Sequence, residues 1–168
     1  TRNSSSAASD VYKRQALKNG VEVKALFIQN TNPLVVAPET VLVRKGFQRK
    51  DLFVCVHEQF LTETAKYADI VLPATSFVEH NDIYIAGGHQ HLTFGPKIIK
   101  ELGECWSNNR LINELSKKMG SVKKEFSFSE EEFIDNTLKI SNLGSLKELK
   151  IKKFIDLQPE FNTSHFIN

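Results

Sequence analysis

Polar side chains gather directly after the apolar stretch Ile70-Val71-Leu72, where Pro73 interrupts it. The next residues carry carboxylates, amides, hydroxyls and an imidazole, and they are Thr75, Ser76, Glu79, His80, Asn81 and Asp82. Groups of this kind bind polar ligands, whereas an unbroken apolar run is typical of a strand buried in a core. The pattern therefore predicts a buried strand with a binding site at its carboxyl end.

Two further apolar runs end in the same way. Residues 24–30 lead into Asn-Thr-Asn-Pro, and residues 51–58 lead into the polar sequence that contains Glu58 and Thr62. In a doubly wound sheet the carboxyl ends of the strands lie at one edge, where ligands bind. Amides and hydroxyls near a helix N-terminus suit phosphate and ribose, while the Glu58 carboxylate suits the paired N–H donors of guanine.

The elements that must position these groups alternate along the chain. Strands are predicted at 24–30, 51–58 and 69–75, with a helix that opens at Pro38 and a short helix over 61–68 between them. This order is typical of an α/β, Rossmann-like βαβαβ fold with a parallel sheet, whose strands are apolar because helices cover both faces.

Weaker signals follow Asp82. Two short strands are expected around the Gly-Gly turn at 87–88, then an extended connection, then a helix over 106–120 with its apolar residues at helical spacing. Ser129 and Glu132 form a capping-box pattern at the start of another helix. The tail from Leu143 shows no closing element.

The domain organisation is predicted in three parts. Residues 1–15 are polar and Ser-rich, and they look like the peptide that arises when sequencing-adapter DNA is translated, so we expect an artefact or a disordered segment. Residues 16–120 form an α/β segment with the predicted binding edge. Residues 121–168 form a partly helical connector.

Composition excludes several function classes. The net charge of +2 arises from 22 basic and 20 acidic residues that are interspersed, which gives no indication of a nucleic-acid partner. No apolar run reaches the length of a membrane-spanning helix. Cys55 and Cys105 lack metal-ligand spacing, and Cys55 is expected to be a buried structural thiol.

Each candidate residue also has a structural interpretation. Asn32 precedes a proline and suits a turn, Thr62 suits a helix N-cap, and Glu79 and Asp82 suit an exposed loop. The three histidines His80, His89 and His91 match no tight zinc pattern. The glycine motifs of ordinary NAD and ATP sites are absent from the sequence.

Several stretches together resemble the molybdopterin oxidoreductase family, which includes dimethyl sulfoxide reductase, formate dehydrogenase and nitrate reductase. They are "ALFIQNTNPLVVAPE", "DLFVCVHEQFLTETAKYADIVLPATSFVEHNDIY", "GGHQHL" and "GECWSNNRLINELSKKMG". The most specific of them is "TETAKYADIVLPAT". The resemblance runs in order from about Gly20 to Gly120.

The resemblance implies roles at matching positions only. The acidic residue that holds the guanine falls on Glu58, where the family commonly has aspartate, and the motif's threonine falls on Thr62. The asparagine after the first strand falls on Asn32. The family's acidic loop falls on Glu79 and Asp82, and its glycine with a polar partner falls on Gly88 and His89, where many relatives have Gly-Arg.

The family implies bis(molybdopterin guanine dinucleotide) with molybdenum or tungsten, an iron–sulfur cluster in an N-terminal part, and electron-transfer subunits as partners. It also implies that residues 16–120 are the later half of one cofactor-binding domain and that residues 121–168 lead toward a C-terminal barrel domain outside this chain. None of the residues of this chain is then catalytic or a metal ligand. A prokaryotic-type cytoplasmic or periplasmic protein is expected. The alternative is a non-catalytic scaffold that resembles the large iron–sulfur subunit of respiratory complex I, which keeps the fold without the molybdenum cofactor.

Overall fold

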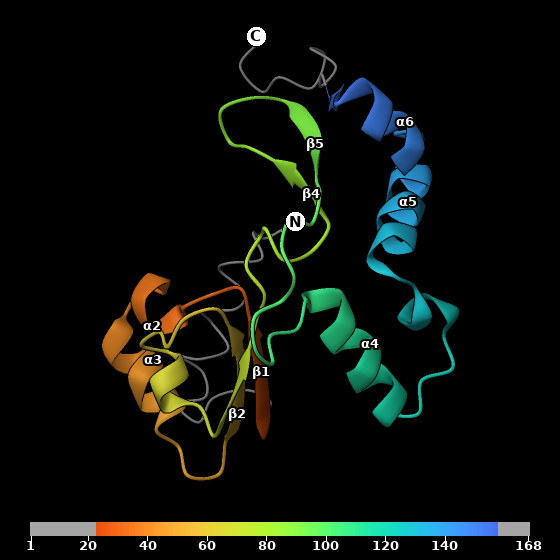
Figure 1. Ribbon diagram of the computed structural model, residues 1–168. Helices are drawn as coiled ribbons and strands as arrows, with labels where there is room; N and C mark the ends of the chain where they lie inside the picture. The colour runs from red at the N-terminus through yellow and green to blue at the C-terminus, as the bar shows by residue number, and fades with distance from the viewer. Residues whose placement is uncertain (1–22, 158–168) are drawn as a thin grey trace, which may run out of the picture. The chain divides into compact units, whose positions relative to one another are not determined.

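The computed structural model describes residues 23–157 (Figure 1). Residues 1–22, which include the predicted segment 1–15, and residues 158–168 lie outside that range. The chain divides into two compact units between Ala74 and Thr75. The boundary predicted at 120/121 falls inside the second unit, and the assignment of 121–168 as a connector stays a prediction.

The first unit contains a parallel sheet with the strands in chain order, β1 (Ala25–Gln29), β2 (Phe53–Glu58) and β3 (Ile70–Pro73). Phe27 of β1 lies beside Cys55 of β2, and Cys55 lies beside Ile70 of β3. Since both pairings are parallel, all three carboxyl ends reach one edge. The α/β class predicted from the alternation of elements is confirmed. The burial predicted for residues 70–72 is wrong, because β3 is the last strand of this sheet and its Ile70 and Val71 side chains are exposed.

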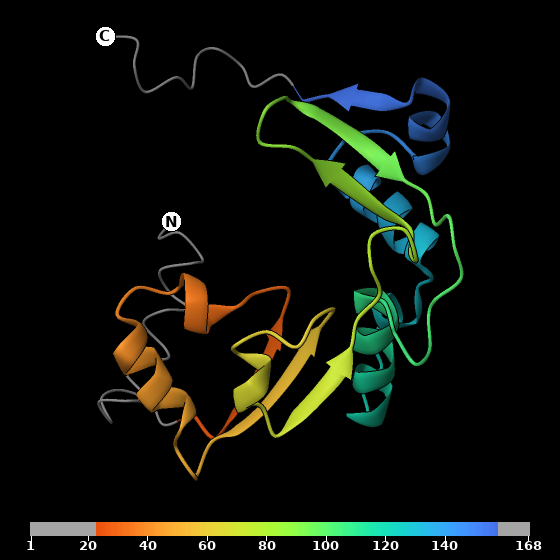
Figure 2. The same ribbon diagram turned by 60° about the vertical axis from the view of Figure 1, so that its left-hand side comes forward.

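Helices α2 (Pro33–Val36) and α3 (Thr40–Phe47) lie between β1 and β2 in the chain and cover one face of the sheet (Figure 2). The core on that face consists mainly of apolar side chains from the strands and both helices: Ile28, Val54, Val56, Leu34, Val43 and Phe47. Burial of side chains of this size is the main stabilising term of the unit.

The helical segments of the first unit differ from the prediction. Asn32 leads directly into α2, which was not predicted, and α3 begins at Thr40 because Glu39 has a left-handed backbone with φ 58°. The helix expected over 61–68 is only one 3₁₀ turn, η1 (Ala65–Tyr67). It ends there because Ala68 must be extended for the next residue to donate its N–H to the Val54 carbonyl at 2.8 Å.

The second unit contains an antiparallel sheet in the order β4 (Asp82–Ile85), β5 (His91–Gly95) and β6 (Phe154–Asp156). The hairpin of β4 and β5 was predicted. Strand β6 pairs with β5, so the expectation that the tail has no closing element is wrong. No local pattern marks β6, because three residues become a strand only through their partner.

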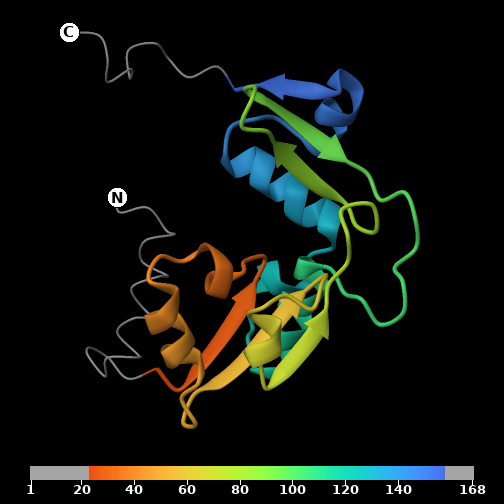
Figure 3. The same ribbon diagram turned by 90° about the vertical axis from the view of Figure 1, so that its left-hand side faces the viewer.

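Helices α5 (Glu130–Ile140) and α6 (Leu146–Lys152) pack on this sheet (Figure 3). Their core comprises Leu92, Ile134, Leu138, Leu146 and Leu149. The capping box at the start of α5 is confirmed, and α6 has a second one from Ser145 and Glu148.

Helix α4 (Asn108–Lys118) and the 3₁₀ turn η2 (Lys124–Ser127) complete the second unit. Helix α4 begins at the Ser107 cap, and Gly120 follows its end with φ 74°. Only Leu111 of its apolar residues is buried. No helix within residues 23–157 is long and apolar enough to cross a bilayer.

Candidate functional site

The carboxyl edge of the parallel sheet carries three of the predicted residues, Asn32, Glu58 and Thr62. Asn32 follows β1, Glu58 ends β2, and Thr62 lies in the loop after it. Beneath them, Gln29 Nε2 and His57 Nδ1 lie 3.1 Å apart, and the His57 side chain is buried. This contact joins the carboxyl ends of β1 and β2.

Asn32 is oriented by a residue that the sequence did not reveal, Thr64. The Thr64 hydroxyl donates to Asn32 Oδ1 at 2.7 Å, and the Thr64 N–H contacts the same atom at 3.3 Å. Thr64 Oγ1 in turn accepts the Leu34 N–H at 3.1 Å. Since Oδ1 is used inside the protein, the Asn32 side chain offers its Nδ2 donor to a ligand.

Glu58 presents a half-used carboxylate at the end of β2. Its Oε1 accepts the Gln59 N–H at 2.8 Å, and its side chain is partly exposed rather than buried. Within residues 23–157 its Oε2 has no hydrogen-bond partner. Glu58 is therefore an acceptor available to a ligand.

Thr62 has the capping role that its type suggests. Its Oγ1 accepts the Ala65 N–H at 3.2 Å at the start of η1. A hydroxyl that accepts one bond keeps its own hydrogen to donate. The capping interpretation and a ligand contact are thus compatible.

Glu79 and Asp82 lie in the second unit, and their surroundings differ. The Glu79 side chain is buried, and its two oxygens accept the Ser76 N–H at 2.6 Å and the Leu102 N–H at 2.8 Å. These backbone donors lower the pKa of Glu79 below its ordinary value. In this structure Glu79 holds its loop together, and Asp82 is the more accessible carboxylate, with its Oδ1 on the Ile83 N–H.

His80 connects Asp82 to the loop after β3. Its Nδ1 lies 2.8 Å from Thr75 Oγ1, and its Nε2 lies 3.8 Å from Asp82 Oδ2. Thr75 is almost fully buried, so it positions the imidazole from inside the unit. The sequence placed His80 among the polar groups after the strand, and its contacts with Thr75 and Asp82 give it a positioning role.

Gly88 and His89 lie in the turn between β4 and β5. A Cβ at Gly88 would meet no atom within 4 Å, so this backbone is open to close approach. His89 is exposed, and its Nδ1 accepts the His91 N–H at 3.1 Å.

Metal and thiol chemistry find no support in the described residues. No group of three or more His, Cys, Asp or Glu side chains within residues 23–157 could hold a metal ion. Cys55 is buried, and burial raises the pKa of its thiol, which makes it inert. The prediction of a structural Cys55 fits this environment.

The comparisons with known proteins identify the class. The model of the molybdopterin oxidoreductase family matches residues 3–118, and the chain belongs to that family. The match begins inside residues 1–15, whose expected origin as an artefact lies outside the described residues and stays a prediction.

Two curated relatives come from Bacillus subtilis. The chain is 44% identical to "Probable oxidoreductase YoaE" over 74% of its own length and 18% of that protein. It is 30% identical to an assimilatory nitrate reductase catalytic subunit over 82% of its length and 19% of that protein. The chain therefore spans less than a fifth of the relatives that it matches.

A solved structure shares the fold. Acetylene hydratase from Pelobacter acetylenicus superimposes with a TM-score of 0.72 over 88% of this chain and 20% of that one, at 23% identity.

The family implies a molybdopterin cofactor, and the side chains at the sheet edge offer both donors and acceptors to a polar ligand. Asn32 offers an amide donor, Thr62 a hydroxyl and Glu58 a carboxylate oxygen. Phosphate and ribose accept hydrogen bonds, and the guanine edge donates them. The seven predicted residues are divided between the units, three in the first and four in the second.

Proposed function

We propose that this chain binds the guanine dinucleotide end of bis(molybdopterin guanine dinucleotide) within a molybdenum- or tungsten-dependent oxidoreductase. The observation that carries the proposal is Glu58. Its Oε2 has no partner within residues 23–157 and lies at the carboxyl end of a central parallel strand, where such sheets bind ligands.

Each residue of the first unit has a separate task. Glu58 accepts the guanine N–H donors, while Asn32 Nδ2 and the Thr62 hydroxyl donate to phosphate or ribose oxygens. The pair of Asn32 with Thr64 holds the amide in one orientation before binding. Pre-organised donors lose little entropy when the ligand arrives.

The second unit contributes Asp82, Gly88 and His89. Asp82 supplies a hydrogen-bond acceptor, and the open backbone at Gly88 allows the cofactor to come close. His89 stands where many relatives have an arginine. Glu79 acts through the backbone of its loop. When bound, the cofactor supplies the two-electron oxidation or reduction, and the residues named here bind and orient it.

The whole protein then includes segments outside this chain. We propose that it carries an iron–sulfur cluster in an N-terminal part and transfers electrons to partner subunits, in the cytoplasm or the periplasm.

Glu58→Gln in the full-length protein tests the proposal. The variant keeps the size of the side chain and replaces one acceptor by a donor, which opposes the guanine N–H groups. We expect the molybdenum content and the guanine released by acid hydrolysis to fall by about tenfold, as for a loss of about 1.4 kcal/mol of binding. Glu63→Gln is the matched control, because Glu63 is exposed and pairs with Lys66.

If both variants and the unmodified protein contain the same amount of cofactor, Glu58 does not bind the cofactor and the proposed role is wrong. A well-folded full-length protein that contains iron–sulfur clusters and neither molybdenum nor tungsten would support the scaffold alternative instead.

A further inference from the structure

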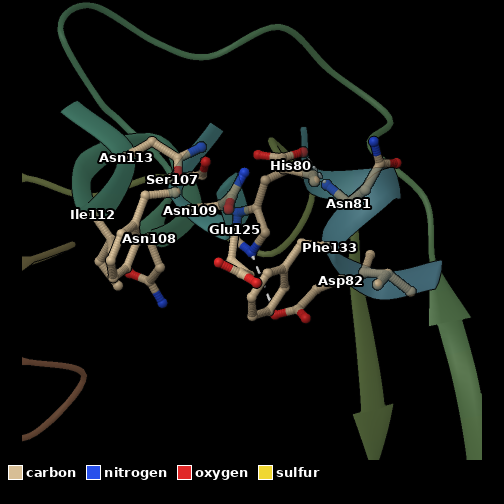
Figure 4. Close-up of a pocket in the computed structure, with 13 residues that line it drawn as sticks. His80, Asn81, Asp82, Ser107, Asn108, Asn109, Ile112, Asn113, Glu125 and Phe133 are labelled. Carbon is tan, nitrogen blue, oxygen red and sulfur yellow. Dashed lines mark hydrogen bonds and ion pairs between the residues drawn. The ribbon is translucent and has the colours of Figure 1, made fainter. Parts of the chain in front are cut away.

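The second unit contains a cavity of about 400 Å³ that shares only Asp82 with the proposed cofactor contacts. Its walls come from the start of β4, from α4, η2 and α5 (Figure 4). Ligand pockets usually begin at about 300 Å³, so the space suits a small molecule.

The polar part of the wall is rich in acceptors. Asn109 and Asn113 both donate their Nδ2–H to the Phe128 carbonyl, at 3.0 and 2.8 Å. Only the nitrogen of an amide can donate to a carbonyl, so the two Oδ1 atoms are identified as acceptors. Neither Oδ1 has a partner within residues 23–157.

Carboxylates outnumber basic groups in the wall. Asp82, Glu125 and Glu130 line the cavity, and the only basic side chain among the lining residues is His80, whose Nε2 lies 3.8 Å from Asp82 Oδ2. The Glu125 carboxylate has no hydrogen-bond or ion-pair partner within residues 23–157, and Glu130 Oε2 accepts the Asn81 N–H at 3.0 Å. The Glu125 and Glu130 carboxylates, which have no basic partner within the described residues, make the cavity attractive to a cation.

The rest of the wall is apolar and partly aromatic. Ile112, Phe126 and Phe133 line it together with the buried Ile134. Figure 4 shows Ile112 and Phe133 together with Glu125 among the side chains that line the cavity. Phenyl faces attract cations and also pack against apolar groups.

We propose that this cavity binds an organic cation, a primary ammonium carried on an apolar or aromatic group. The ammonium has three N–H donors for the Oδ1 and carboxylate acceptors, and the apolar group packs on Ile112 and the two phenyl rings. A bare metal ion does not fit, since the described carboxylates and histidines form no metal-binding group.

The test uses the 168-residue chain and three probes of similar shape. 2-Phenylethylamine is the cation, 2-phenylethanol its neutral analogue and 3-phenylpropanoate the anion. Binding is followed by NMR shifts of the Asn109 and Asn113 side-chain amides, which a site elsewhere would not move. We expect saturable binding of the amine and affinity lower by about tenfold or more for the other two.

Variants locate the charge. Glu125→Gln combined with Glu130→Gln should weaken amine binding by about tenfold, since a rim and a half-buried carboxylate are both removed. Glu131→Gln is the matched control, because Glu131 lies next to Glu130 but pairs with Lys150 instead of lining the cavity.

Three results would overturn the proposal. They are equal binding of 2-phenylethanol, an unchanged affinity in the double variant, and no shift of the two amides by the amine in a chain that gives a dispersed spectrum. The unmodified chain with the three probes decides the matter even if the double variant does not fold.

Discussion

The Thr64 hydroxyl donates a 2.7 Å hydrogen bond to Asn32 Oδ1 across 32 residues of sequence. Thr64 is fully buried, and the same hydroxyl oxygen accepts the Leu34 N–H. This contact fixes the loop after β1 to the loop after β2. It also determines which end of the Asn32 amide is available at the edge of the sheet.

Thr64→Val should therefore destabilise the first unit. Valine has nearly the same shape, but it leaves the Leu34 N–H and Asn32 Oδ1 with one partner fewer, which costs about 1–3 kcal/mol. Urea unfolding of the 168-residue chain measures the loss. Thr64→Ser keeps the hydroxyl and should cost about 1 kcal/mol or less. A valine variant as stable as the serine variant would show that the hydrogen bonds contribute little.

Glu79 should make the stability of the second unit depend on acid. Two backbone N–H groups lower the pKa of Glu79 below its ordinary value of 4.5. A carboxyl group whose pKa is lower in the folded state than in the unfolded state stabilises the folded state at pH values above 4.5. This contribution is lost as the pH falls from 4.5 to the lowered pKa.

Glu79→Gln removes that titration, so we expect a lower stability at neutral pH and a flatter decline below pH 4.5. Urea midpoints measured across this range give the comparison. Glu104→Gln serves as a control, because Glu104 is an exposed carboxylate of the same unit. An acid limb of unchanged slope in the Glu79 variant would contradict the prediction.

Tyr84 differs from Glu79, because its polar atom has no hydrogen-bond partner within the described residues. Its hydroxyl is buried. Burial also raises the pKa of Tyr84. Tyr84→Phe should leave stability unchanged or raise it by about 1 kcal/mol, because the desolvated hydroxyl is removed and the ring stays.

Gly95 on the neighbouring strand leaves the room that the Tyr84 ring occupies. A Cβ at Gly95 would overlap the Tyr84 ring on the neighbouring strand, so Gly95→Ala should lower stability by about 1–3 kcal/mol. Thermal unfolding of both variants checks the pair of predictions. A clear loss of stability in Tyr84→Phe would reveal a partner for the hydroxyl.

Local chemistry was enough to predict the parts of the fold whose signals lie within a few residues. The apolar runs that became β1, β2 and β3, the hairpin around Gly87-Gly88 and the capping box of Ser129 all belong to this class. The family was also predicted from the sequence, because the stretch "TETAKYADIVLPAT" is specific to it.

Tertiary structure decided what depends on partners far along the chain. Thr64 became the partner of Asn32, Leu102 contributed an N–H to Glu79, and Phe154–Asp156 became a strand beside β5. The helix expected over 61–68 shrank to one turn because β3 had to pair with β2. Local propensity is worth only tenths of a kcal/mol per residue, so a long-range hydrogen bond that must be made overrides it.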